Sequence, residues 1–138
     1  MGQRNIHITE FDLMRLRSLI IEARYSNYRD TPYLDSLAKE LNEAIVVPSK
    51  EMPPDVITMN SRVRLRDLDA DEEMVYTLVF PEDANISQGK VSVLAPIGTA
   101  MLGYRVGEIF EWQVPEGIRK IKIEEMLYQP EASGDYDV

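Results

Sequence analysis

A proline-bearing stretch at residues 48–54 divides the chain into two parts with different hydrophobic periods. Its three prolines remove backbone donors and push the preceding residues toward extended conformations, so neither a helix nor a central strand can run through it. Before the stretch, apolar residues recur at spacings of three and four, and after it they alternate with polar residues. The sequence therefore predicts a helical unit at residues 1–48 and a sheet domain at residues 49–138.

The first part is predicted to form a short antiparallel helical hairpin of the coiled-coil type. Thr9 followed by Asp12 resembles a capping box, and the second helix has Thr31 as its N-cap and Pro32 at its first position. The two apolar stripes are Leu13, Leu16, Ile20 and Ala23, and then Leu34, Leu37, Leu41 and Ala44 or Ile45. Matching stripes with a short connection favour antiparallel packing. At about 1.5 Å per residue, the hairpin is about 25 Å long.

The second part is predicted to be an antiparallel sheet with one short helix. Arg62, Arg64 and Arg66 alternate with Val63 and Leu65, which indicates a strand with one basic and one apolar face. Further strands are predicted at residues 74–80, 90–94, 110–114 and 118–128, the first of them central because it is apolar on both faces. The helix is predicted at residues 96–103. Residues 129–138 are predicted to form a polar, acidic tail. The fold class is α+β.

The net charge of −9 belongs mainly to the sheet domain, since residues 1–49 carry 6 basic and 7 acidic side chains and residues 50–138 carry 9 and 17. An acidic chain repels phosphates, so it is a poor stand-alone binder of DNA or RNA. The absence of cysteine excludes disulfides and thiolate sites, and a single histidine, His7, disfavours histidine-centred catalysis. No apolar run is long enough to span a membrane and no signal peptide precedes the first helix, so we expect a cytoplasmic protein.

Carboxylates are candidate metal ligands at two places. The acidic cluster at residues 67–73 lacks the spacing of an EF-hand loop, so a solvated hairpin turn is the preferred interpretation. Asp30 and Asp35 lie at the predicted hairpin tip and in the first turn of the second helix, where they complement the positive helix end. Their alternative role is to present a carboxylate to a metal ion in another protein. Phosphate-loop, serine-hydrolase and metalloprotease motifs are missing, so we assign no catalytic residue and no cofactor.

Two further groups of residues have a structural and a functional interpretation. The stripe of Arg62, Arg64 and Arg66 is typical of a solvated strand face, or it meets an acidic partner surface or a phosphate backbone. The aromatic residues are most simply core, or they line a groove for a proline-containing peptide. These aromatic residues are Tyr76, Phe80, Tyr104, Phe110 and Trp112.

Part of the sheet domain resembles the signature of the GreA/GreB transcript cleavage factors. That signature is Ser-Pro-(aliphatic)-Gly-x-Ala-Leu-(aliphatic)-Gly, followed by Val-Gly-Asp and a Pro-x-Gly turn. The corresponding residues here are Ala95-Pro96-Ile97-Gly98-Thr99-Ala100-Met101-Leu102-Gly103, Val106-Gly107-Glu108 and Pro115-Glu116-Gly117. Residues 51–63 and 128–136 resemble a narrower branch of the family, the Rnk-type regulators, which also have a shortened hairpin.

The resemblance implies an FKBP-like sheet domain that docks on bacterial RNA polymerase near its secondary channel, with the hairpin pointing into that channel. The contact with the polymerase would be made by Ala95, Pro96 and Ile97, with help from Arg62 or Arg64. Ala95 stands in place of the family's serine. Nucleic acid would be reached only through the polymerase. The protein would then be a transcription regulator and not an enzyme.

The cleavage factors also carry Asp-x-x-Glu at the hairpin tip, which helps to bind a magnesium ion in the polymerase. Neither Asp30 nor Asp35 has a glutamate three positions later, and the hairpin is short, so we expect no stimulation of transcript cleavage. Two alternatives are an active cleavage factor that uses Asp30 or Asp35, and a prolyl isomerase that uses the aromatic groove. The oligomeric state stays open between a monomer and a weak homo-oligomer.

Overall fold

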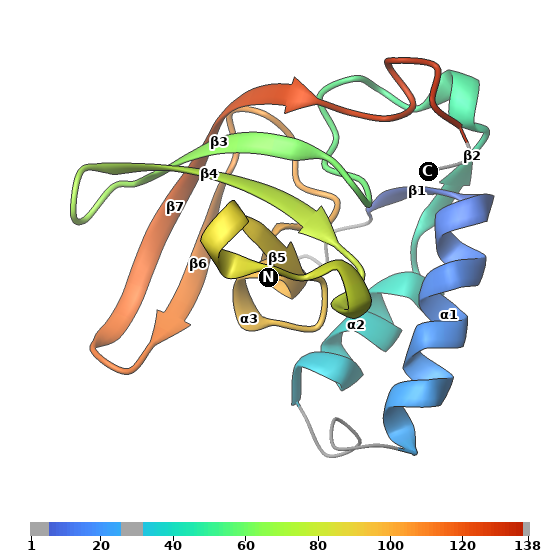
Figure 1. Ribbon diagram of the computed structural model, residues 1–138, viewed down its shortest axis with the longest axis horizontal. Coiled ribbons are helices and arrows are strands. Elements are labelled where there is room, and N and C mark those ends of the chain that lie inside the picture. Colours follow the sequence, from blue (N-terminus) through green and yellow to red (C-terminus); the bar gives the residue numbers. More distant parts are fainter. Residues whose placement is uncertain (1–5, 26–31, 137–138) are drawn as a thin grey trace.

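The computed structural model describes residues 6–25 and 32–136 (Figure 1). Two helices come first and a curled sheet follows, which confirms the mixed α+β fold class. The elements are β1 (His7–Thr9), α1 (Glu10–Arg24), α2 (Pro32–Asn42), β2 (Ile45–Val47), β3 (Arg62–Asp67), β4 (Glu72–Val79), β5 (Lys90–Ser92), α3 (Pro96–Met101), β6 (Ile109–Val114) and β7 (Gly117–Tyr128). Short 3-10 helices lie between them at η1 (Ser49–Glu51), η2 (Pro81–Asp83) and η3 (Ile86–Gln88). In the described ranges, no helix is both long and apolar enough to cross a membrane.

Helix α1 begins where the sequence predicts it to begin. The hydroxyl of Thr9 accepts a hydrogen bond from the backbone N–H of Asp12 at 3.1 Å, which satisfies one of the free amides of the first turn. Helix α2 begins at Pro32, as predicted, whereas its predicted N-cap, Thr31, lies outside the described residues. The predicted stripes are buried at Leu13, Leu16, Ile20 and Ala23 in α1 and at Leu34, Leu37 and Leu41 in α2.

The structure contains a small parallel sheet that the sequence analysis does not predict. Its two strands lie just before α1 and just after α2 in the chain. Strand β1 pairs with β2, so that His7 lies opposite Ile45 and Thr9 opposite Val47. Ile45 is therefore an exposed strand residue and does not belong to the apolar stripe of α2. The strands have three residues each, which is too short for an alternating pattern to be recognised in the sequence.

The main sheet has the strand order β5-β4-β3-β7-β6 (Figure 1). Its central pairs, β3 with β4, β3 with β7, and β6 with β7, are antiparallel as predicted. The prediction of a wholly antiparallel sheet is wrong at one edge, because β5 runs parallel to β4 with Thr77 opposite Lys90. The segment 80–89, which contains η2 and η3, is too long for a tight hairpin turn and carries the chain back before β5 begins.

Residues 129–135 fold back onto the domain instead of extending as a tail. Gln129 is only 2% exposed, and its side-chain amide donates hydrogen bonds to the carbonyls of Pro53 and Val56 at 2.8 and 2.7 Å. The hydroxyl of Thr58 donates to Glu131 at 2.8 Å. Buried carbonyl groups need such partners, so this segment completes the hydrogen bonding of the loop between β2 and β3.

One contiguous cluster of buried residues connects the helices to the sheet. It contains Leu16 of α1, Leu37 of α2, Leu65 of β3 and Ile123 of β7. Helix α3 lies next to α2 and packs against β5 and β6 (Figure 1). The helices are thus held against the sheet through shared burial of apolar surface, which is the dominant favourable contribution to folding.

Candidate functional site

The loop between β5 and α3, where the sequence places the docking residues, is held by a set of local hydrogen bonds. The backbone N–H of Leu94 donates to the hydroxyl of Ser92 at 3.0 Å, and the N–H of Ala95 donates to the Ser92 carbonyl at 3.0 Å. The hydroxyl of Thr99 donates to the carbonyl of Val93 at 2.5 Å. Both ends of the loop are therefore tied to the same short stretch of backbone, which fixes its shape.

The three predicted docking residues differ in exposure. Pro96 is exposed and is the first residue of α3, where its missing N–H costs no hydrogen bond. Ala95 is half-buried in an extended conformation before it. Ile97 is only 6% exposed and belongs to the core. A partner can therefore touch Pro96 and Ala95, while Ile97 anchors the loop.

Glycine is required at position 98 because two segments of backbone approach each other closely there. A Cβ atom at this position would lie 1.9 Å from the carbonyl oxygen of Ser92 and 3.1 Å from the Cα of Val93. Any side chain would force α3 away from the end of β5. The sequence shows this glycine as part of the family motif, but its steric role depends on a contact that only the folded chain makes.

The predicted arginine stripe is largely neutralised within the sheet. Arg64 forms ion pairs with Glu73, Glu124 and Glu125, which stand on the neighbouring strands β4 and β7. Arg66 pairs with Glu124 at 2.8 Å, and this hydrogen bond raises the pKa of Arg66 and lowers that of Glu124. Cross-strand pairs of this kind stabilise the sheet modestly and leave little net positive charge.

Arg62 is the member of the stripe that is exposed and forms no ion pair among the described residues. It lies on β3, two strands away from β5 in the sheet order, or about 10 Å at the usual strand spacing. Arg62 is thus better placed than Arg64 to meet a partner.

In the acidic segment at residues 67–72, a carboxylate accepts hydrogen bonds from backbone N–H groups of the same segment, in agreement with the interpretation as a turn. Asp67 accepts hydrogen bonds from the N–H groups of Ala70 and Asp69 at 3.0 and 2.9 Å and pairs with Arg119 at 3.0 Å. These contacts, the bond from Ala70 first, lower the pKa of Asp67. Within the described ranges, no three or more His, Cys, Asp or Glu side chains group as metal ligands.

The aromatic residues are core residues in the fold. Phe80 and Phe110 are buried, and Tyr76, Tyr104 and Trp112 pack against the same cluster. The rings of Tyr104 and Phe110 meet with centroids 5.5 Å apart. The core interpretation is confirmed, and nothing in this packing favours a peptide groove lined by all five rings.

Asp12 has a larger role than its position in the sequence indicates. It is only 2% exposed, and its carboxylate accepts a hydrogen bond from the backbone N–H of Met59 at 3.3 Å, which joins α1 to the loop before β3. It also pairs with Arg15 at 2.5 Å. The Arg15 guanidinium in turn lies over the rings of Phe11 and Phe80, at 4.0 and 4.7 Å from their centroids. The sequence marks Asp12 only as an acid near the start of a helix.

Burial raises the pKa of Asp12 to about 6, although the hydrogen bond and the charge of Arg15 act in the opposite direction. Because this pKa lies above the ordinary 3.8, the carboxyl stabilises the folded state most when it is protonated. That contribution is complete below pH 3.8 and is lost as the pH rises through about 6.

We therefore expect the free energy of unfolding of the wild type to fall relative to Asp12→Asn by about 2 kcal/mol as the pH rises from 4 to 6. Asparagine does not titrate, so the difference between the two proteins isolates this carboxyl. Urea unfolding at several pH values measures the effect, and the exposed Asp83→Asn is the control. A wild-type-to-variant difference that stays constant across this range would contradict the assignment.

Two family profiles together match nearly the whole chain. The profile described as "Rnk N-terminus" matches residues 4–47, and "Transcription elongation factor, GreA/GreB, C-term" matches residues 52–128. The chain is 41% identical over 137 residues to the "Regulator of nucleoside diphosphate kinase" of Escherichia coli strain K12, over 99% of this chain and 98% of that protein.

The chain belongs to the Rnk and GreA/GreB family. The resemblance seen in the sequence is confirmed. GreA of Chloroherpeton thalassium is 41% identical over 90 residues, which cover 65% of this chain and 57% of GreA. A solved structure of a GreA/GreB transcription elongation factor from Nitrosomonas europaea superimposes with a TM-score of 0.77 at 39% identity, over 91% of this chain and all of that one. The Rnk and GreA/GreB fold therefore extends over the helices as well as the sheet.

The structure describes one of the two carboxylates that the sequence analysis places near the predicted hairpin tip. Asp30 lies outside the described residues. Asp35 stands in the first turn of α2, is well exposed, and lies 3.6 Å from Arg24 at the end of α1. The structure thus places Asp35 beside a basic residue of the other helix.

Proposed function

We propose that the chain is a transcription regulator that binds bacterial RNA polymerase through its sheet domain. The observation that carries the proposal is the similarity over 99% of the chain to the Escherichia coli regulator, together with the hydrogen-bonded loop at Ala95 and Pro96. That loop is rigid, exposed at its tip and anchored by Ile97, which are the properties of a docking element.

The proposal assigns separate tasks to the two parts of the chain. Residues 49–138 form an FKBP-like domain that docks near the secondary channel, and Arg62 assists at its surface. Residues 1–48 form an antiparallel helical hairpin that points toward the channel. Nucleic acid is contacted only through the polymerase, since a chain with a net charge of −9 has no general attraction for phosphates.

We also propose that the chain does not stimulate transcript cleavage. Helix α1 has 15 residues and α2 has 11, so the longer helix spans about 22 Å. A carboxylate must come within coordination distance of a metal ion to contribute to its chemistry. Asp35, on the shorter helix and beside Arg24, is poorly suited to that task.

A competition experiment with GreA tests the proposed function. The labelled chain is titrated with purified bacterial core RNA polymerase, and GreA is then added as competitor. We expect saturable binding that GreA displaces, because both proteins would use one docking site. In the same complexes, backtracked transcripts should stay uncut with the chain alone, and an excess of the chain should reduce cleavage by GreA.

The outcomes separate the possible functions. Shortened transcripts with the chain alone would favour the cleavage factor that uses Asp30 or Asp35, and Asp35→Asn would then test which carboxylate acts. If the chain binds but GreA does not displace it, the docking site is elsewhere on the polymerase. Absence of binding would contradict the proposal as a whole.

A further inference from the structure

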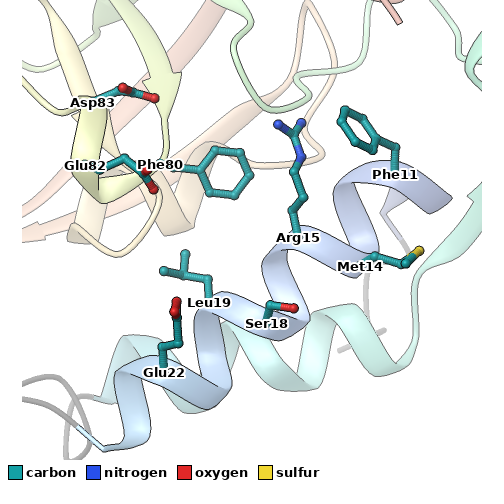
Figure 2. Close-up of a pocket in the computed structure, with 9 residues that line it drawn as sticks. All are labelled: Phe11, Met14, Arg15, Ser18, Leu19, Glu22, Phe80, Glu82 and Asp83. Atoms are coloured by element: carbon teal, nitrogen blue, oxygen red, sulfur yellow. The ribbon is translucent and has the colours of Figure 1, made fainter. Parts of the chain in front are cut away.

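A groove of about 500 Å³ runs along α1 on the side that faces η2 (Figure 2). Phe11, Met14 and Leu19 of α1 form much of one wall, and Phe80 stands on the other. Figure 2 shows the side chain of Arg15 pointing between the two phenylalanine rings, where it stacks on both. The groove is therefore lined by apolar and aromatic side chains around one guanidinium group, which stacks on both rings.

Part of this apolar surface is open to solvent. Met14 is 62% exposed and Phe11 is 40% exposed, although both face the groove. The charge of Arg15 is balanced by its ion pair with Asp12. Exposed apolar side chains that gather in a concave surface are typical of a binding site for another molecule.

Acidic side chains stand on both sides of the groove. Glu22 belongs to α1, and Glu82 and Asp83 belong to η2 (Figure 2). All three are exposed, and none of them forms an ion pair in the parts of the chain that the structure describes. Their negative charge selects for a positively charged occupant and acts against a second copy of a chain whose net charge is −9.

We infer that this groove binds a basic amphipathic helix of a partner protein. Its apolar face would pack on Phe11 and Met14, and its Lys or Arg side chains would meet Glu22, Glu82 and Asp83. The groove follows α1 from residue 11 to residue 22, about 16 Å, which matches about three turns of an accompanying helix. Helices that lie in such grooves are held by apolar anchors at helical spacing. The inference does not depend on docking through Pro96.

The direct test uses the full chain and a fluorescent synthetic peptide of about four helical turns, with Leu on one face and Lys on the other. We expect saturable binding, measured by fluorescence anisotropy. A peptide of the same composition with the Leu residues scattered around the helix should bind at least about tenfold more weakly, because it cannot place its apolar side chains together. A Leu/Glu peptide should not bind.

Variants with matched controls test whether the peptide binds in the groove. Met14→Lys should weaken binding about tenfold, whereas Ile21→Lys should change it little, since Ile21 is 61% exposed on the same helix but does not line the groove. Glu82→Lys should weaken binding more than Glu116→Lys, which makes the same charge change in the exposed turn between β6 and β7. These substitutions are at exposed positions and should leave the fold intact.

Three results would overturn the inference. The first is absence of peptide binding at millimolar concentration, and the second is equal weakening by each variant and its control, which would indicate unspecific attraction between charges. The third is self-association in sedimentation experiments that Met14→Lys abolishes, which would make a second copy the occupant.

Discussion

Replacing Gly98 by alanine is expected to lower the free energy of unfolding by about 3–5 kcal/mol, a loss that a domain of this size barely tolerates. The new methyl group would lie 1.9 Å from the Ser92 carbonyl oxygen, well inside any allowed contact. The clash is with backbone, so no side-chain rotation can relieve it. We expect the clash to push α3 away from the end of β5, which would also break the hydrogen bond from Thr99 to the Val93 carbonyl.

Urea unfolding or a thermal melt of the purified variant measures this effect. Gly107→Ala is the matched control, because Gly107 has a φ of +95° but open space around its Cβ position. Its cost is the backbone strain alone, about 1 kcal/mol. If the two variants were equally stable, the close packing of α3 on Ser92 would be wrong.

Replacing Pro96 by aspartate is expected to weaken binding to core RNA polymerase by about tenfold or more, because a charge would stand at the centre of the proposed contact. The fold should survive, since Pro96 is exposed and occupies the first position of α3. An acidic residue there interacts favourably with the positive end of a helix. A loss of affinity would therefore report on the contact and not on the stability of the domain.

Titration of the labelled variant with polymerase measures the change, and its urea unfolding curve is recorded beside it. Pro115→Asp, in the exposed turn between β6 and β7, carries the same chemical change away from the loop. Unchanged affinity for Pro96→Asp would rule out this loop as the docking element, even if competition with GreA succeeded. A loss of affinity in both variants would point to the charge of the whole domain.

The candidate site was predictable where it follows from a short run of residues. Ala95 and Pro96 stand at the start of a helix that their own sequence signals, and the structure exposes Pro96 there. The sequence does not show that Ile97 next to them is buried. The alternation of residues predicts the basic face of β3. It does not show that Arg64 forms ion pairs with glutamates of the same sheet. Those glutamates come from β4 and β7, and their register is set by the whole sheet.

Local sequence patterns are sufficient to predict the break at residues 48–54, the two helices, the cap at Thr9 and most of the strands. Each depends on interactions between residues a few positions apart: side-chain period, helix capping and the stiffness of proline. Contacts made only in the folded chain set the parallel pairings of β1 with β2 and of β4 with β5, the burial of Asp12 against Met59 and the docking of Gln129. In all of these the partners are far apart in the chain, or the elements are too short to carry a pattern. Their geometry depends on how the helices and the sheet share one core, and no local sequence pattern encodes it.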